Sequence, residues 1–480
     1  MYLDVEEWVD VNRQVIRAVA TLDLRSLAAM RIGIGALMLA DVLERSSRLT
    51  LDYTDEGLLP RSWLIEAGRD APLLFVHGVD GGAPFAAACM IASAVVAALL
   101  LAGWRTRMMS LLAWILWSSL QARNPMIAHH GDTILRFILF WGALLPWGAR
   151  WSLDARRRPP APDAFVGPAA VGYLLQLVFV YAFSVAYKTG PAWREDFDAV
   201  ALALRVHGYA TPLGEALLGY PRAIVALTIS VLALEALGAF LVLSPWRTEA
   251  ARLVAAAAFI TFHVGLGLTM RLGLFVPLAI VAWIGVLPAR VWRRGPPTIG
   301  ESVGGRAATW ITAAATAFAL LVNVDALASF RARTDVASPL PALPVVAKIA
   351  ARMGLSQEWS MFAPEPASLS GRLRATMTRA DGETVDVLRG EVVEPNGPLP
   401  DGPRAPLRVR QQELRWAYWM YPEAVERYAR YACANGVFGE PPPPPGLLTV
   451  RAGLASTREV DRTTPPEWIE LVSVPCDPAR

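Results

Sequence analysis

A single lysine stands at the end of a long uncharged run in this sequence. Residues 164–187 carry no charged side chain, and Lys188 follows them within the stretch YAFSVAYKTGPAW, from Tyr181 to Trp193. One interpretation is an interfacial lysine whose stem lies along a helix while its ammonium reaches water. The other is a partly desolvated lysine, because burial favours the neutral amine, which can act as a base. The stretch alone leaves both interpretations open.

A polar segment, RNPMIAHHGDTILR, contains two adjacent histidines, His129 and His130. Their imidazoles either cap the start of a membrane span in a polar loop or form hydrogen bonds at a buried site. No third or fourth ligand stands at a suitable spacing, so we expect no metal site. Asp132 and Arg136 are four residues apart at a helix start, which predicts an ion pair and a favourable acidic side chain at the helix N-terminus.

Two ionisable residues lie inside apolar runs, Glu235 and His263. Such groups are costly within a membrane and usually face the protein interior. Glu235 is therefore either a hydrogen-bonded carboxyl that holds helices together or a functional residue, and His263 is expected to have a partner. The same two residues are the ones that a proton path across the membrane would use.

The composition is that of a polytopic membrane protein. Of the 480 residues, 54% are hydrophobic and 18% are charged, and the mean hydropathy is +0.37, whereas soluble domains carry about 25% charge. The first 25 residues contain several acidic side chains and no apolar core, so we expect no cleavable signal peptide. The sequence contains neither the nucleotide-binding pattern GxxxxGK[ST] nor a TVGYG-like filter, which argues against a nucleotide-driven pump or a potassium channel.

The uncharged runs predict an all-α polytopic membrane bundle (about nine transmembrane helices), because about 20 apolar residues cross a bilayer. An amphipathic helix is expected in residues 1–24, the transmembrane domain in residues 25–330, and a separate domain in residues 335–480. The first and fourth predicted spans contain charged residues, and the third is short. These three are therefore the least regular. The predicted spans are 25–43, 83–103, 108–122, 133–149, 166–187, 223–245, 253–270, 272–289 and 307–328.

Arginines concentrate in every second predicted loop. The positive-inside rule assigns such loops to the cytoplasm. It therefore predicts a cytoplasmic N-terminus, with the C-terminal part outside. The basic loops carry Arg105 and Arg107; Arg150, Arg156, Arg157 and Arg158; Arg247 and Arg252; and Arg290, Arg293 and Arg294.

The sequence of the C-terminal part predicts a small α+β extracytoplasmic domain. LRATMTRADGETVDVLRG predicts a hairpin with its turn at Asp381 and Gly382. QQELRWAYWMYPEAVERYARYA predicts a helix, either continuous or broken near Pro422, and LLTVRAGLAST and EWIELVSV predict two further strands. The aromatic residues of the helical stretch are expected to pack rather than bind a ligand. Cys89 lies in an apolar run, so at most one disulfide is expected, between Cys433 and Cys476.

Several blocks, taken together and in order, resemble the HTTM (horizontally transferred transmembrane) domain of the vitamin K-dependent gamma-carboxylase-like superfamily, bacterial type. The resemblance covers about residues 20–370. The blocks are DLRSLAAMRIGIGALMLADVLERSSRL with YTDEGLLPR, RNPMIAHHGDTILRFILFWGALLPWGARWSLD, YAFSVAYKTGPAW, FHVGLGLTMRLGLF and QEWSMFAPEP.

The resemblance implies a specific chemistry. Characterised carboxylases of the family oxidise a reduced quinone (vitamin K-like) with oxygen, and the resulting base removes a proton from a peptide glutamate, which takes up carbon dioxide. Lys188 falls on the family's catalytic lysine, and His130, with His129 as the alternative, falls on its catalytic histidine. Tyr187 and Val185 depart from the animal enzymes, which have a second lysine and a glycine there. The other candidate ligand-binding residues are Tyr53, Asp55, Arg123, Asn124, Asp132, Trp193, Glu235 and His263.

Three functions are therefore open. The first is quinone-dependent base chemistry on a peptide or small substrate at the outer face of the lipid bilayer. The second is a non-catalytic accessory or maturation factor for a secreted peptide, in which the polar segments are structural. The third is a proton-coupled transporter that uses Glu235 and His263.

Overall fold

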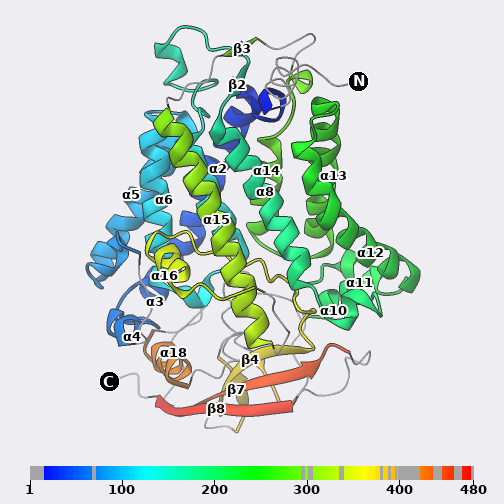
Figure 1. Cartoon of the computed structure of the whole chain (residues 1–480). Coiled ribbons are helices and arrows are strands. Elements are labelled where there is room, and N and C mark those ends of the chain that lie inside the picture. Colours follow the sequence, from blue (N-terminus) through cyan, green and yellow to red (C-terminus); the bar gives the residue numbers. More distant parts are fainter. Residues whose placement is uncertain are drawn as a thin grey trace.

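The computed structural model describes residues 16–66, 72–206, 208–292, 298–300, 306–334, 340–378, 382–387, 391–394, 397, 422–435, 446–458 and 467–476. Most of the N-terminal helix expected in residues 1–24 lies outside these ranges, and residues 16–19 are helical. The described chain is mostly helical, with one small sheet at each end of a helical bundle (Figure 1).

Six of the described helices are long and apolar enough to cross a membrane. They form the upright bundle of Figure 1, and local chemistry explains where the first begins and where the second ends. The Asp23 side chain caps the first by accepting from the backbone N–H groups of Arg25 and Ser26. Gly103, with φ +72°, ends the second. The six are α2 (Leu24–Ser46), α5 (Ala83–Ala102), α8 (Pro168–Tyr187), α12 (Pro221–Leu237) with its continuation η4 (Gly238–Leu243), α13 (Thr248–Thr269) and α15 (Arg306–Arg333).

Three further helices lie at the remaining predicted spans. They are α6 (Thr106–Arg123), α7 (His130–Leu144) and α14 (Phe275–Ile284). None of the three meets the same length and hydropathy requirements. Six candidate crossings are therefore established by length and composition among the described residues, and the expected nine are not confirmed.

Short helices connect these elements. They are α3 (Leu49–Tyr53), α4 (Arg61–Glu66), η1 (Val76–Gly78), η2 (Pro125–Ile127), η3 (Ala155–Arg157), α9 (Pro191–Arg194), α10 (Ala199–Arg205), α11 (Pro212–Leu217), η5 (Ala289–Val291) and α16 (Pro344–Arg352).

The charge inside the first span has a structural role. Arg31 is fully buried in α2 and donates hydrogen bonds to the carbonyl oxygens of Leu100 (2.7 Å), Leu101 (2.5 Å), Trp147 (3.2 Å) and Trp151 (2.6 Å). Leu100 and Leu101 belong to the last turn of α5, where the carbonyls lack the usual helical partner four residues later, and the carbonyl of Leu100 also accepts from the cap N–H of Gly103 at 3.0 Å. A guanidinium at a helix C-terminus satisfies them and complements the helix dipole.

A three-stranded sheet that the sequence pattern does not predict closes this end of the bundle. Its strands β1 (Thr21–Asp23), β2 (Ala164–Val166) and β3 (Ile299–Gly300) pair in the order β1-β2-β3. Arg252 ties α13 to it by donating to the carbonyls of Val19 and Thr21. The described parts of the basic loops predicted to be cytoplasmic lie at this end, and the C-terminal sheet lies at the other (Figure 1). The cellular side of each end stays a prediction.

The C-terminal sheet has five strands in the order β6-β5-β4-β7-β8. Strand β4 (Leu369–Thr378) pairs antiparallel with β5 (Thr384–Asp386), which confirms the predicted hairpin. The two further predicted strands are β7 (Gly446–Ser456) and β8 (Glu467–Cys476), and β6 (Glu391–Val392) is the outer strand beyond β5. The predicted helix is confirmed in its second half as α18 (Pro422–Asn435), and its aromatic residues Trp416, Tyr418, Trp419 and Tyr421 lie outside the described residues.

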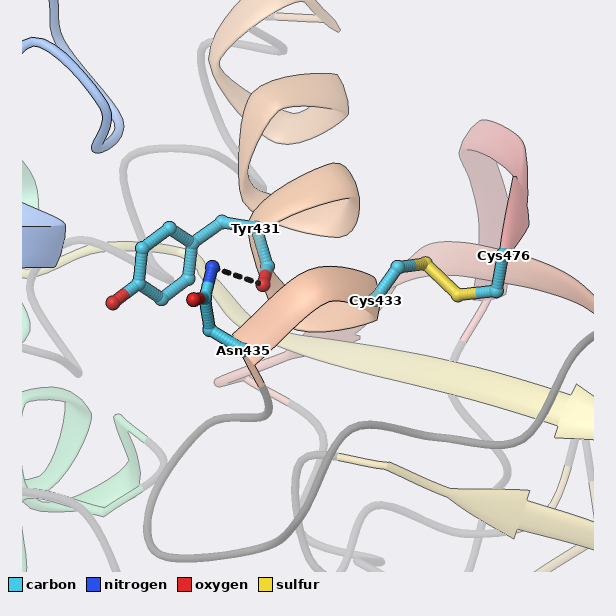
Figure 2. Close-up of a disulfide and its surroundings, with 4 residues drawn as sticks. All are labelled: Tyr431, Cys433, Asn435 and Cys476. Carbon is cyan, nitrogen blue, oxygen red and sulfur yellow. Dashed lines mark hydrogen bonds between the residues drawn. A yellow bond between two sulfur atoms is a disulfide. The ribbon is translucent and has the colours of Figure 1, made fainter. Parts of the chain in front are cut away.

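A disulfide joins Cys433 on α18 to Cys476 at the end of β8 (Figure 2), as the sequence allowed. Asn435 turns back in the same last turn of α18 and donates to the carbonyl of Tyr431 at 3.3 Å. Cys89 is free and buried. The disulfide therefore fastens the helix to the outer strand of its own sheet.

The C-terminal sheet packs directly on the bundle. Leu58, in the loop after α3, and Met126 of η2 share one hydrophobic cluster with Leu373 of β4 and Val425 of α18. Burying this apolar surface fixes the sheet against the loops between α2 and α7. We call this the sheet end of the bundle, and the candidate site lies there.

Candidate functional site

Lys188 lies at the sheet end of α8, immediately after the last helical residue. It is only 2% exposed. Its Nζ donates to Ser184 Oγ at 2.6 Å and to Glu235 Oε2 at 2.5 Å. The interpretation of Lys188 as a snorkelling interfacial lysine is therefore wrong, because its head is turned into the bundle and bonded there.

Glu235 reaches this lysine from α12, 47 residues further along the chain. It is 5% exposed, so both charges of the pair are removed from solvent. A buried ion pair is tolerated only when each partner has good geometry and further hydrogen bonds. Ser184 supplies one such bond, and the ring of Trp193 lies 5.1 Å from Nζ, within the range of a cation–π contact.

The pair faces a cavity of about 430 Å³, which we call the lysine cavity. Apolar and aromatic side chains make most of its wall, and the ionisable groups on it are Lys188, Glu235, Glu365 and three histidines. Ligand sites typically combine such an apolar wall with a few convergent polar groups. The histidines are His129, His130 and His263, and the other aromatic wall residues are Tyr181, Trp193, Tyr209, Phe262, Phe275 and Phe362.

A segment from the start of the C-terminal part closes one side of the lysine cavity. Phe362 accepts a hydrogen bond at its carbonyl from Trp193 Nε1 at 2.8 Å, and the carbonyl of Pro364 accepts from the backbone N–H of Gly190 at 2.9 Å. Ser360, Met361, Ala363 and Ala367 also line the cavity. This wall, which includes Glu365, was not assigned to the site from the sequence. The block QEWSMFAPEP had marked the segment, without showing that it packs on the lysine stretch.

His263 is held in an aromatic cluster. Its Nδ1 lies 2.7 Å from the carbonyl of Phe259, which can only accept, so Nδ1 carries the proton. Its Nε2 lies 3.5 Å from the hydroxyl of Tyr181, which accepts a bond from Trp283 Nε1 at 2.8 Å. His263 thus has the partners that an imidazole inside a span requires, and it also reaches the cavity wall.

His129 caps α7, which begins at His130. Its Nδ1 accepts a hydrogen bond from the backbone N–H of Gly131 at 3.0 Å, while Asp132 Oδ2 accepts from the backbone N–H of His129. This reciprocal capping box fixes the first turn of the helix. The loop-capping interpretation of His129 is confirmed, and both histidines also line the lysine cavity.

The ion pair predicted between Asp132 and Arg136 is wrong. Asp132 Oδ1 instead accepts from Arg45 at 2.8 Å, whereas Arg136 donates to the carbonyls of Gly354 (3.3 Å) and Ser356 (3.1 Å). An i,i+4 pair gains little at a helix surface, and a buried arginine on a neighbouring helix offers Asp132 a better partner.

That arginine is the centre of a second buried polar cluster. Arg45 is 2% exposed and donates to Asp41 (2.9 Å), Asp132 (2.8 Å) and the hydroxyl of Tyr53 (2.7 Å), while Asp41 also accepts from Trp117 Nε1 at 2.9 Å. We call these five residues the Arg45 cluster. It joins α2, α3, α6 and α7. It thereby holds the N-terminus of α7, where the histidine pair lies. Asp41 and Arg45, four residues apart at the end of the first span, were the sequence signal for it.

The remaining candidate residues do not line the lysine cavity. Tyr53 and Asp132 belong to the Arg45 cluster. Asp55 pairs with Arg61 (2.8 Å) and Arg123 (3.3 Å). Burial alone would raise the pKa of Asp55, but the hydrogen bonds from Arg61 and the charge of Arg123 hold it below its usual range. Asn124 bonds the backbone of Asp52 and Met126.

No protein-family model, curated protein or solved structure matches this chain. The geometry of the site therefore has to support the functional inference. It brings together Lys188, His129, His130, Trp193, Glu235 and His263 of the predicted site residues, and it separates Tyr53, Asp55, Arg123, Asn124 and Asp132 from them. No group of three or more metal-binding side chains is found among the described residues.

Proposed function

We propose that this chain is a membrane-embedded enzyme that removes a proton from an apolar substrate at the Lys188–Glu235 pair. The observation that carries the proposal is a buried lysine, bonded to a carboxylate, on the wall of a largely apolar cavity. Lysine is rare in this sequence: of the 45 Lys and Arg residues, two are lysines, Lys188 and Lys348. Arginine cannot give up its proton in a protein, whereas a buried lysine can, so a lysine at this position suits proton transfer.

The pair can take up one proton without creating a net charge in the cavity. Before the reaction Nζ and Oε2 share one proton, and the pair is neutral overall. After it accepts a proton from a substrate hydroxyl, the pair consists of an ammonium and a carboxylic acid. The substrate anion then forms beside a positive charge in a desolvated site, where such stabilisation is strongest.

The substrate that we propose is a reduced quinone, the class implied by the sequence resemblance to the gamma-carboxylase-like superfamily. A quinone headgroup is a flat apolar ring with two oxygens, and the cavity is lined by aromatic side chains and a few polar groups. Phe262, Tyr209 and Phe362 would hold the ring, while Lys188 and His130 would hold its oxygens. When bound, the reduced quinone would supply the acidic hydroxyl and, with oxygen and carbon dioxide, the further chemistry of that family.

The transporter alternative draws support from Glu235 and His263, which line the same cavity. However, the cavity at the opposite end, of about 190 Å³ and lined by Asp23, Glu249 and Arg252, shares no lining residue with it. Since transport needs a path between the two faces, we favour the enzyme. The accessory-factor alternative predicts no substrate turnover at all.

The test is oxidation of reduced menadione in membranes that contain the full chain. We expect Lys188→Met to lower the rate by about 100-fold, the usual contribution of an acid–base group. Lys348 lies exposed on α16, so Lys348→Met is the matched control and keeps the wild-type rate. Equal rates for wild type and Lys188→Met would refute the proposal.

A further inference from the structure

A second cavity of about 460 Å³ lies beside the lysine cavity, between α7, α15, α16 and the residues after α16. Its character is different, because charged and hydroxyl side chains occupy much of its wall. Arg136 enters it from α7, Asp325 and Arg333 from α15, and Glu358 from the segment that continues to the lysine cavity. We call it the polar cavity. Its volume is sufficient for about 15 water molecules at about 30 Å³ each.

The charged side chains on the wall of the polar cavity balance, with two arginines and two carboxylates. Arg333 pairs with Glu358 at 2.9 Å, and both side chains are more than a third exposed. Asp325 is 6% exposed and accepts a hydrogen bond from the backbone N–H of Leu343 at 2.5 Å. The exposed pair places one side of the cavity at the protein surface, at the sheet end.

Two residues line both cavities, and both are histidines. His129 and His130 are the lining residues shared by the polar cavity and the lysine cavity. Both are partly buried, at the N-terminus of α7. Imidazole is the side chain best suited to exchange protons near neutral pH. The wall between an apolar reaction space and a polar space open to the surface is therefore made by proton carriers.

Proton abstraction creates a need for such a connection. The ammonium and the carboxylic acid left after the reaction must lose one proton before the next turnover. Lys188 and Glu235 are 2% and 5% exposed, and hydrocarbon side chains line most of the space around them. A proton released into that space has no solvent to accept it, whereas an imidazole on its wall can.

We propose that the polar cavity is the proton outlet of the lysine cavity, and that the proton passes through His130, which His129 holds in place at the start of α7. The inference rests on the proposed function. The proton leaves the carboxyl of Glu235, binds an imidazole nitrogen of His130 to give an imidazolium, and passes from it to water in the polar cavity. His129 stays neutral in this step, because its Nδ1 accepts from the backbone N–H of Gly131 and holds the helix cap. No bond other than those to this proton is made or broken, and no electron is transferred.

The first test is aqueous access, which needs no turnover. Ser329 lines the polar cavity and Ala203 lines the lysine cavity, so Ser329→Cys and Ala203→Cys are matched probes in a Cys89→Ala background. A charged, membrane-impermeant thiosulfonate added at the sheet end is expected to label Ser329→Cys at least about tenfold faster, because an ionic reagent enters only a hydrated space. Equal labelling of both, or none at Ser329→Cys, would overturn the outlet.

The second test separates proton release from proton abstraction. His129→Asn keeps the helix cap, because asparagine is a good N-cap residue, and His130→Gln keeps a polar side chain. The double variant keeps Lys188 and Glu235, and it is expected to slow the later turnovers of reduced menadione about 100-fold more than the first. Added imidazole should restore the later turnovers, which a merely structural role of the histidines would not explain.

The outcomes are distinguishable from failure of the proposed function. That failure appears in Lys188→Met as wild-type turnover. Two results refute the outlet when Lys188→Met is inactive. In one, the double histidine variant turns over like wild type. In the other, the double variant loses its first turnover as much as its later ones and imidazole does not rescue it.

Discussion

The ammonium of Lys188 lies 2.5 Å from the carboxylate of Glu235, with both side chains buried between α8 and α12. Neither charge has solvent to stabilise it, so each depends on the other. The pair is therefore a structural link between the two helices, and under the proposed function it is also the reactive group. Its two roles can be separated by mutation, because stability responds to unpaired charge and reactivity responds to the lost proton acceptor.

The pair is expected to show strong thermodynamic coupling. Lys188→Met or Glu235→Leu alone leaves one buried charge without a partner and should lower the free energy of unfolding by about 3–5 kcal/mol. The double variant should lose much less than the sum, since it buries no charge. Thermal unfolding in nanodiscs gives the stability of the four proteins: wild type, the two single variants and the double variant. The exposed pair Arg333–Glu358 is the control, with an expected coupling below about 1 kcal/mol. Additive losses at Lys188 and Glu235 would contradict the coupling.

The Arg45 cluster predicts a severe single-site effect outside the cavity. Arg45→Met would leave the carboxylates of Asp41 and Asp132 buried without their shared cation, at a cost of about 3–5 kcal/mol in unfolding free energy. Adding Asp132→Asn to Arg45→Met should recover part of this loss. Arg430→Met, which breaks an exposed pair with Glu426 on α18, should change stability by less than about 1 kcal/mol. The account of the cluster fails if Arg45→Met and Arg430→Met unfold at the same temperature as wild type.

The buried loop histidine His77 predicts acid sensitivity. Burial, together with the nearby charges of Arg45 and Arg123, lowers the pKa of His77 from 6.5 to about 4. The unfolded chain therefore binds a proton that the folded chain does not over this interval. His77 contributes fully to stability above about pH 6.5, and its contribution is lost as the pH falls towards about 4. The loss amounts to about 3 kcal/mol.

His77→Gln should flatten this part of the pH profile of the unfolding temperature, because glutamine does not titrate and can still bond Ser119, the present partner at 2.9 Å. An unchanged slope between wild type and variant over the same pH interval would show that another group causes the acid sensitivity.

The sequence predicted Lys188 as a site residue, but it could not predict its environment. An uncharged run that ends in one lysine is compatible with both a snorkelling and a buried head. The choice depends on how α8 and α12 are rotated against each other, which places Glu235 beside Nζ. A mid-span carboxyl and a span-end lysine are each unusual, and only packing shows that they neutralise one another.

Local spacing misled the prediction for Asp132, because long-range partners outweighed the i,i+4 neighbour. Arg45, 87 residues earlier, meets Asp132 at 2.8 Å. The C-terminal hairpin was predicted well, since its strand alternation and its turn glycine, Gly382 with φ +86°, are local features. The segment around Phe362 was not assigned to the site, because its contact with Trp193 depends on how the sheet docks on the bundle.

The most direct test of the central claim is the absorbance of reduced menadione bound under anaerobic conditions, where deprotonation can be seen without oxidation. The wild-type chain in nanodiscs is expected to bind it with the spectrum of the quinol anion, because the Lys188–Glu235 pair takes the proton. Lys188→Met should give the spectrum of the neutral quinol, and Lys348→Met that of the anion. A neutral spectrum in wild type, or an anion in Lys188→Met, would contradict proton removal by this pair.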